Sequence, residues 1–322
     1  MSQIVAVDIG GTHTRFAIAE VEDGTALSLG EACTLKTGEH VSLAGAWDQF
    51  RLESGGALPP AAAIAFAGPV NGDTLKLTNS SWVLRPSTLA RELGVDRLTI
   101  VNDFGAVAHA VAQLGPEHYL HLCGPETDLP AEGLISVVGP GTGLGVAQLV
   151  RRGGTYQAVE TEGGHIGFAP LDPVEDRILA ALRERFGRVS VERLVAGMGL
   201  AHIHEVLAAI DGRPVFSLDD KALWTAALDG TDSGASDALT RYCLCLGSVA
   251  GDLALAHGAA GVAIAGGLGL RLARHLPRSG FAERFVAKGR FRDRMERLPV
   301  KLLTHKQPGL FGAAAAFARE HR

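Results

Sequence analysis

AVDIGGTHTRFAIA, residues 6–19, is the stretch of this 322-residue chain that most directly predicts its fold. A β-branched run from Ile4 to Ile9 meets Gly10-Gly11-Thr12, and residues 15–21 are apolar again. Apolar runs of this length around glycines predict two strands joined by a tight turn. Because glycine has no Cβ, such a turn lets the backbone approach a phosphate closely, and the threonine adds a hydroxyl.

The same pattern recurs about half a chain later. Residues 135–138 predict a strand, GPGTGLG at Gly139–Gly145 a turn, and residues 146–150 a second strand. A third glycine turn, Ala265-Gly266-Gly267, follows the apolar run 261–265. The repeat indicates two related halves. Three such turns together favour nucleotide binding over three unrelated hairpins.

Strands and helices alternate along the rest of the chain. Further strands are expected at 61–67, 98–101 and 298–303. Helices with defined ranges are expected at residues 87–93, 104–114, 173–186, 236–257 and 309–319, with Ser87 as the cap of the first and Asp172 as the cap of the third. Three more helices are expected to begin after a cap at Ser190, after the sequence 217–220, which resembles a capping box, and after the turn at Gly266-Gly267. The alternation predicts an α/β fold, and the hairpins make its sheets mixed. Since no Pro- or Ser-rich linker separates the halves, we expect two domains with a cleft between them.

Composition narrows the function classes. The net charge of −5 gives no basic surface for nucleic acid or anionic lipid, so neither partner is expected. The four cysteines form no CxxC pair, which fits a reducing compartment. The N-terminal MSQIVAVDIGG lacks the basic region of a signal peptide, and the apolar stretch 258–270 is too short to span a bilayer. We therefore expect a cytoplasmic protein.

Two other phosphate-binding motifs are missing from the sequence. Neither GxxxxGK[ST] nor GxGxxG occurs, which disfavours P-loop and dinucleotide-binding folds.

Asn102 and Asp103 follow the predicted strand 98–101, where ligands bind in open α/β sheets. A carboxylate there can accept the proton of an attacking hydroxyl. Either residue can equally cap the helix that follows, and both interpretations stay open. The DFG spelling at 103–105 is not a protein-kinase match, because no HRD or VAIK segment accompanies it.

Four further polar residues are candidates. Asp8 either caps its turn or holds Mg²⁺ through water. Glu162 and His165 flank a Gly-Gly bend, and no HExxH or Cys/His set supports zinc there. Glu192 either compensates a helix dipole or joins a binding site. Carboxylate, amide and imidazole groups together suit the vicinal hydroxyls of a sugar.

Nine segments carry a resemblance that covers nearly the whole chain: AVDIGGTHTRFAIA, IAFAGPV, LTNSSW, VNDFGAVAHAV, VGPGTGLGVA, EGGHIGFAP, VSVERLVAG, IAGGL and LFGAAAAFA. In this order they resemble bacterial glucokinases of the non-ROK type, within the hexokinase/actin/Hsp70 ATPase superfamily. The resemblance implies a two-domain actin-like ATPase (ribonuclease H-like) fold. Its small domain would be residues 1–110 completed by the C-terminal helix 306–322, and its large domain residues 111–305. Homodimers are common in that family.

The resemblance also assigns roles to individual residues. It implies ATP and Mg²⁺ as cofactors and glucose as substrate, with Asp103 as general base on the sugar 6-hydroxyl and Asp8 at the metal. ATP would contact Asp8, Ile9, Gly10, Gly11, Thr12, Gly141, Thr142, Gly143, Gly266 and Gly267. Glucose would contact Asn79, Asn102, Asp103, Glu162, His165 and Glu192.

Two alternatives remain at this point. One is a kinase for another hexose or amino sugar, such as mannose or N-acetylmannosamine. The other is a non-enzymatic, actin- or Hsp70-like nucleotide switch. The ROK branch is disfavoured because its cysteine-rich zinc motif is missing: no cysteine follows His165 until Cys243. The few residues before the first strand also leave no room for the DNA-binding domain of a ROK repressor.

Overall fold

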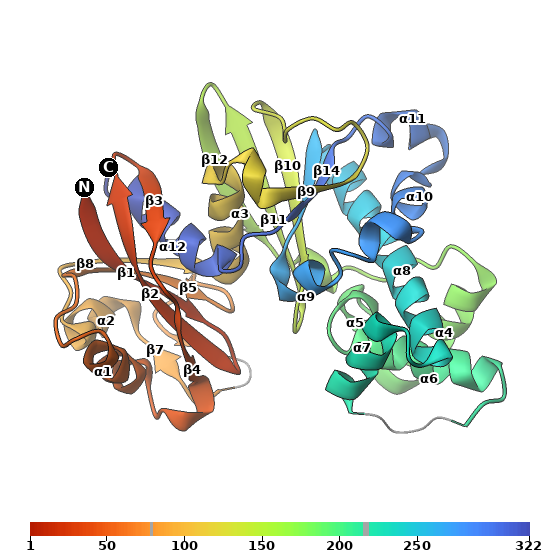
Figure 1. Cartoon of the computed structure of the whole chain (residues 1–322), viewed down its shortest axis with the longest axis horizontal. Helices are drawn as coiled ribbons and strands as arrows, with labels where there is room; N and C mark the ends of the chain where they lie inside the picture. Colours follow the sequence, from red (N-terminus) through yellow and green to blue (C-terminus); the bar gives the residue numbers. More distant parts are fainter. Residues whose placement is uncertain (78–79, 215–218) are drawn as a thin grey trace. The chain divides into compact units, whose positions relative to one another are not determined.

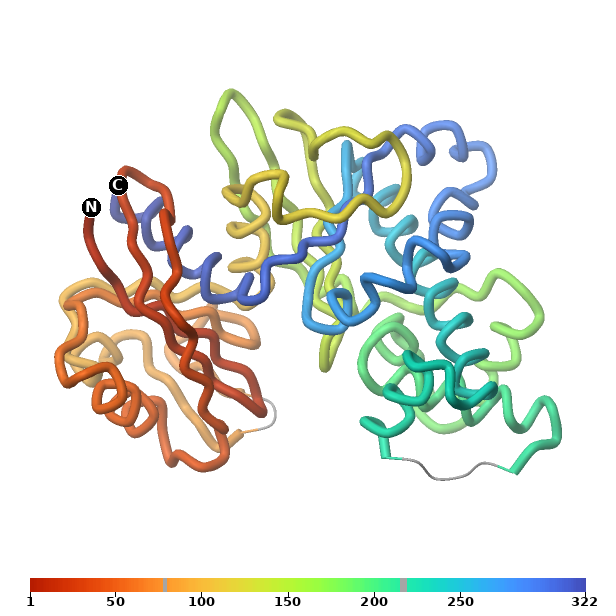
Figure 2. Tube along the Cα trace, in the orientation of Figure 1, coloured from red at the N-terminus to blue at the C-terminus, as the bar shows by residue number. Residues whose placement is uncertain are grey.

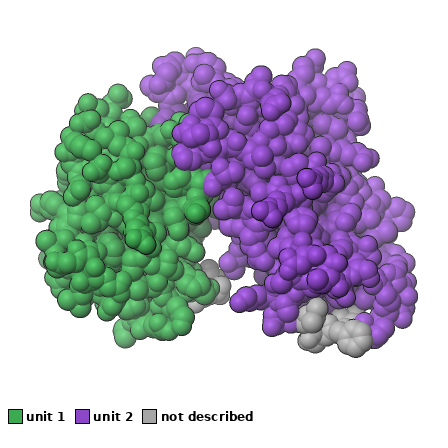
Figure 3. All heavy atoms as spheres, viewed as in Figure 1, with its two compact units in different colours: residues 1–115, 158–160, 305–322 green, residues 116–157, 161–304 purple. Residues whose placement is uncertain are grey.

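Two sheets organise the computed structural model, which describes residues 1–77, 80–214 and 219–322. Apart from residues 158–160, each sheet lies within one of the two compact units that Figure 3 colours separately. Unit 1 comprises residues 1–115, 158–160 and 305–322, and unit 2 comprises residues 116–157 and 161–304.

The sheet of unit 1 is mixed. Its strands are β1 (Ser2–Ile9), β2 (His13–Glu22), β3 (Thr25–Leu29), β4 (Cys33–Lys36), β5 (Ala61–Phe66) and β8 (Arg97–Asn102). They lie in the order β3-β2-β1-β5-β8, with β4 also on β2. β1 and β2 form the predicted antiparallel hairpin, whereas β5 runs parallel to β1 and β8 parallel to β5. A separate small pair, β6 (Leu75–Lys76) and β7 (Val83–Leu84), lies off this sheet.

Helices cover both faces of this sheet (Figure 1). Ile4 and Ala6 of β1 pack in one core with α3 (Asp103–Gln113) and α12 (Pro308–Glu320). Val5 and Val7 pack in the other core with α1 (Leu43–Glu53) and α2 (Pro86–Leu93). This split follows from the two-residue period of a strand. The two chain termini lie close together in this unit, as the trace in Figure 2 shows.

Unit 2 repeats the same strand topology. Its strands are β9 (Tyr119–Cys123), β10 (Gly133–Pro140), β11 (Leu144–Arg152), β12 (Thr155–Thr161), β13 (Gly261–Ile264) and β14 (Val300–Leu303), in the order β12-β11-β10-β13-β14-β9. β10 and β11 form an antiparallel hairpin, and β13 and β14 continue in parallel. The set β2-β1-β5-β8 thus recurs as β11-β10-β13-β14, which confirms the two related halves.

The helices of unit 2 gather around one long central helix. They are α4 (Pro173–Phe186), α5 (Glu192–Val195), α6 (Gly199–Ile210), α7 (Asp220–Asp229), α8 (Ser233–His257), α9 (Gly266–Arg271), α10 (Phe281–Val286) and α11 (Arg292–Met295). By length and composition α8 alone among the described helices passes the test for a membrane span, but 72% of its most apolar window is buried inside the protein. That burial is typical of a core helix.

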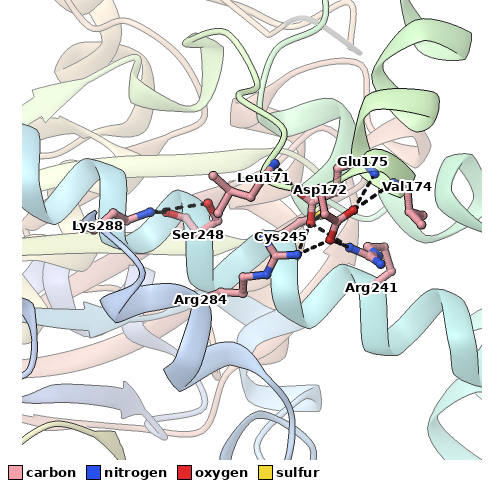
Figure 4. A network of polar contacts seen from close by, with 9 residues as sticks. All are labelled: Leu171, Asp172, Val174, Glu175, Arg241, Cys245, Ser248, Arg284 and Lys288. Carbon is pink, nitrogen blue, oxygen red and sulfur yellow. Dashed lines mark hydrogen bonds and ion pairs between the residues drawn. The ribbon is translucent and has the colours of Figure 1, made fainter. Parts of the chain in front are cut away.

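Arginines and carboxylates join three of these helices in one largely buried cluster (Figure 4). Arg241 of α8 and Arg284 of α10 both contact Asp172 at the start of α4. They also reach the fully buried Glu175, at 3.0 and 3.2 Å. We call these four residues the α4 cap cluster. Its two positive and two negative charges balance, so it acts as a joint between helices.

The structure corrects three local predictions. Ser87 does not cap α2: Pro86 already starts that helix, and no side chain caps it. Ser190 does not cap α5, which begins after Val191 without a side-chain cap. Gly266 and Gly267 form the first turn of α9 instead of a separate turn. The predicted cap at 217–220 falls partly on residues outside the described part of the chain, and α7 is capped by the side chain of Asp219.

Candidate functional site

The carboxyl ends of three parallel strands in unit 1 stop in one row. Ile9 at the end of β1 pairs with Phe66 of β5, and Phe66 pairs with Asn102 of β8. This register places the first glycine turn and the Asn102-Asp103 pair at the same edge of one sheet, where ligands bind in α/β folds. The Ile9 side chain is fully buried, so a nucleotide could reach this residue only through its main chain.

The first glycine turn is held from outside its own hairpin. Within it, the Gly10 N–H donates to the His13 carbonyl at 2.9 Å, and Gly11 and Thr12 lie at the tip. Thr37, fully buried just beyond β4, donates its hydroxyl to the Gly10 carbonyl at 2.8 Å and its N–H to the Thr12 carbonyl at 3.0 Å. These two bonds fix both ends of the glycine segment.

Asp8 lies beside this turn, and its carboxyl group is confined on two sides. Arg15, its partner across the hairpin, places a guanidinium nitrogen 3.4 Å away. A Cβ on Gly309, in the first turn of α12, would lie only 3.0 Å from the Asp8 carboxyl carbon. Burial raises the pKa of Asp8, while the charge of Arg15 and its hydrogen bond act to lower it. The amino end of α12 also favours the ionised carboxylate.

The helix cap beside Asp103 is Asn102. Its Oδ1 accepts the N–H groups of Phe104 and Gly105 at 2.9 and 3.0 Å, and its Nδ2 donates to the Gly68 carbonyl at 3.0 Å. Asp103 is instead the first residue of α3, and its Oδ1 accepts from the Phe104 N–H at 2.9 Å. Of the two residues that could cap the helix, Asn102 is the one that takes the cap position.

In unit 2 the second glycine turn is shorter than predicted. Gly139 pairs with Gly145, and Pro140 pairs with Leu144, so the hairpin ladder absorbs both ends of the expected seven-residue turn. The remaining turn is residues 141–143, closed by a bond from the Gly141 N–H to the Gly143 carbonyl at 2.8 Å.

The third glycine segment contacts the second. Gly266 has a φ of 82°, and a Cβ there would lie 2.7 Å from the Pro140 carbonyl. On another side, the Gly197 N–H donates to the Gly141 carbonyl at 2.8 Å, and Trp224 donates its indole N–H to the Gly197 carbonyl. Two of the three predicted phosphate segments therefore meet within unit 2.

The segment with Glu162 and His165 presses against the start of β11. A Cβ on Gly163 would lie 2.9 Å from the Cβ of Val146, and one on Gly164 would collide with the Leu144 carbonyl. The two glycines therefore let the backbone lie directly on the strand that follows the second turn.

Backbone pairing then brings Glu192 to the same place. Gly167 forms a bridge with Ser190, and the Val191 N–H donates to the Ile166 carbonyl at 2.9 Å. These bonds join the segment after His165 to the segment before Glu192.

The three predicted sugar ligands of unit 2 differ in their surroundings. Glu162 and His165 are 67% and 58% exposed, with Oε2 and Nε2 3.8 Å apart. Glu192 accepts the Leu144 N–H at 2.9 Å through Oε2, which would lie 2.5 Å from a Cβ on Gly143. Glu192 thus contacts the second glycine turn directly.

The predicted site residues form two groups. Unit 1 assembles Asp8, the first turn, Asn102 and Asp103, and unit 2 assembles the other two glycine segments with Glu162, His165 and Glu192. Asn79 lies outside the described residues. Within the described ranges no three His, Cys, Asp or Glu side chains are placed to share a metal ion.

Sequence reasoning missed four supporting residues: Arg15, Thr37, Glu160 and Gly197. Arg15 had a usable signal, because a hairpin of known turn length pairs it with Asp8. Thr37 and Gly197 had none, since they reach the turns from far along the chain. Glu160 lies two residues before Glu162, but nothing local in the sequence links it to Asn102.

Comparison with known proteins gives consistent results. The glucokinase family model matches residues 5–320. A glucokinase from Zymomonas mobilis is 60% identical over 319 residues, with 99% of this chain and 98% of the relative covered. The crystal structure of a glucokinase from an Antarctic psychrotroph has a TM-score of 0.85 at 32% identity, with 98% and 99% of the two chains covered.

A more distant structure shares the fold alone. It is a ROK family glucokinase from Streptomyces griseus in complex with glucose and AMPPNP, with a TM-score of 0.64 at 20% identity and 97% and 98% of the two chains covered. These neighbours establish the actin-like ATPase fold of sugar kinases with mixed sheets.

Proposed function

This chain belongs to the glucokinase family and phosphorylates glucose with ATP, and from that premise we propose that Asp103 is the general base of the reaction. The observation that carries the proposal is the row Ile9, Phe66 and Asn102, which sets Asp103 at the sheet edge shared with the first glycine turn. Asp103 would accept the proton of the glucose 6-hydroxyl as that oxygen attacks the γ-phosphate.

The sugar is held, in this proposal, by hydrogen bonds from Asn79, Asn102, Glu162, His165 and Glu192. The exposed Glu162 and His165 have acceptors and donors to offer to neighbouring hydroxyls. Asn102 contributes less, because both cap bonds use its Oδ1 and the Gly68 carbonyl takes one Nδ2 hydrogen. A site built this way discriminates strongly against sugars that lack a bonded hydroxyl.

The phosphates of ATP are assigned to the three glycine segments, with Asp8 as the residue that would hold Mg²⁺. One carboxylate suffices, since Mg²⁺ usually takes one or two carboxylates with waters and phosphate oxygens. Asp8 fits because its side chain is 23% exposed and lies next to the first turn, although Arg15 shares it. Bound there, the ion would neutralise charge on the transferring phosphoryl group.

The remaining assignments rest on the family resemblance and, for the cytoplasm, on the sequence composition. We propose a homodimer in the cytoplasm that feeds glucose into glycolysis. The division into a small domain, residues 1–110 completed by 306–322, and a large domain, 111–305, belongs to the same proposal.

Replacing the base tests the central claim. Asp103→Asn keeps the size of the side chain but removes the proton acceptor, so kcat should fall by about 10²–10⁴ with the ATP KM nearly unchanged. Asp96→Asn, an exposed change in the same unit, is the matched control. An Asp103→Asn enzyme with most of its kcat would refute the assignment.

The preference for glucose is checked separately. The wild-type enzyme is assayed with a panel of sugars that includes mannose and N-acetylmannosamine, and turnover is measured by ADP release.

A further inference from the structure

Glu160 holds the main chain at the start of α3. Its Oε1 accepts the N–H of Asn102 at 3.0 Å. Asn102 is thereby fixed by its backbone as well as by its side chain, which caps α3 and donates to Gly68. The next residue along the chain is Asp103, so the position of its carboxylate depends on how firmly Asn102 is held.

Gly105 gives independent support for this contact. A Cβ at this position would lie 2.7 Å from Oε1 of Glu160 and 3.0 Å from its Cγ. Gly105 is buried within α3, and its φ is not positive, so the backbone conformation does not require glycine. Glycine also has a lower helix propensity than alanine. The reason for glycine here is the space that the Glu160 side chain occupies.

We propose that Glu160 is a positioning residue for phosphoryl transfer: its carboxylate fixes the Asn102 peptide and so aims the Asp103 carboxylate at the sugar hydroxyl. The inference rests on the proposed role of Asp103 as base. Glu160 touches neither substrate in this scheme. A misplacement of about 1 Å at a reacting group costs up to about 10²-fold in rate, so a single anchoring bond can matter.

Two substitutions separate the hydrogen bond from the charge. Glu160→Ala removes the acceptor and should lower kcat by about 10- to 100-fold, with the ATP KM within about twofold. Glu160→Gln keeps an oxygen that can accept the Asn102 N–H and should recover kcat to within about threefold of the wild type. If Glu160→Gln is as impaired as Glu160→Ala, the negative charge matters and the positioning role is wrong.

Gly105→Ala provides a second, independent test. Its Cβ would displace the Glu160 carboxylate, so kcat should fall about as much as in Glu160→Ala, although alanine has the higher helix propensity. In the double variant Gly105→Ala/Glu160→Ala the added methyl has room, and kcat should be no lower than in Glu160→Ala alone. Multiplicative losses in the double variant would contradict a shared mechanism.

Asp103→Asn in the same experiment distinguishes the two proposals. An inactive Asp103→Asn enzyme beside a fully active Glu160→Ala enzyme overturns only the positioning role. An active Asp103→Asn enzyme overturns the assignment of the base, and with it this inference.

Discussion

The start of α3 in unit 1 and the start of α4 in unit 2 use the same cap for different purposes. In each, one side-chain oxygen, from Asn102 or Asp172, accepts two N–H groups of the first turn. In each, a glutamate accepts one more backbone N–H beside the cap: Glu160 from Asn102 at 3.0 Å, and Glu175 from Leu171 at 2.8 Å.

The two caps differ in the first residue of the helix and in the groups that contact the cap side chains. At α4 the first residue is Pro173, and two arginines neutralise the cap carboxylates. At α3 the first residue is Asp103. The cap side chain of Asn102 and the carboxylate of Glu160 there accept backbone N–H groups instead of charged donors. Neutralised charges make the α4 cap a joint for stability. At α3 the surrounding neutral hydrogen bonds suit the role of base that we propose for Asp103.

Breaking the α4 cap cluster should give the largest change in stability. Glu175→Ala leaves two largely buried arginines sharing one carboxylate, at a cost of up to about 3–5 kcal/mol, the range for a fully buried pair. Urea unfolding should show this loss, while kcat measured well below the unfolding transition stays near that of the wild type. Glu184→Ala, an exposed change on the same helix, should stay within about 0.5 kcal/mol. A marked loss of kcat in the folded Glu175→Ala enzyme would erase the contrast between the two caps.

Loosening the first glycine turn should have an intermediate effect. Thr37→Val keeps the shape of the side chain but leaves the half-buried Gly10 carbonyl without its hydroxyl donor, at a cost of up to about 1–3 kcal/mol. Because the turn is assigned to ATP, the ATP KM should rise several-fold while the glucose KM stays constant. Thr37→Ser keeps the hydroxyl and should behave like the wild type. Equal changes in both KM values would argue against the assignment of the turn.

The smallest expected effect is a difference in acid sensitivity. The α3 region should lose stability at a higher pH than the α4 cap cluster. Burial, aided by the charge of Arg319, lowers the pKa of His109 in α3 to about 4. The unfolded chain therefore binds more protons than the folded one between about pH 6.5 and pH 4, so stability falls as the pH falls through this window. We expect a loss of about 1–2 kcal/mol from pH 7 to pH 5 in urea unfolding, and a smaller one in His109→Gln.

The α4 cap cluster loses its contribution only at lower pH. Burial opposes ionisation of Asp172, but hydrogen bonds from the Glu175 N–H and from both arginines outweigh it and lower the pKa of this carboxyl. Its stabilisation is present above the ordinary aspartate pKa of about 4 and is lost as the pH falls through the lower folded value. If His109→Gln and the wild type lose the same free energy of unfolding between pH 7 and pH 5, protonation of His109 is not the cause of that loss.

Carboxylates approach glycines at three places. These contacts give a structural reason for glycines that the sequence either assigned only to a phosphate loop or gave no role. Asp8 faces Gly309, Glu160 faces Gly105, and Glu192 faces Gly143, each within 3.0 Å of where a Cβ would stand. Gly143 is thus required by Glu192 as well as by any phosphate.

The sequence by itself determined the strand–turn–strand repeat, the α/β class and the pairing of Asn102 with Asp103, because each depends on residues adjacent in the chain. Only the tertiary structure decided which of the two caps the helix and what holds them. Thr37 acts on Gly10 across 27 positions, Glu192 on Leu144 across 48 and Glu160 on Asn102 across 58. Such bonds depend on strand register and packing, and neither periodicity nor propensity encodes them locally. The residue that we propose as base was therefore visible in the sequence, whereas the contacts that hold it in place were not.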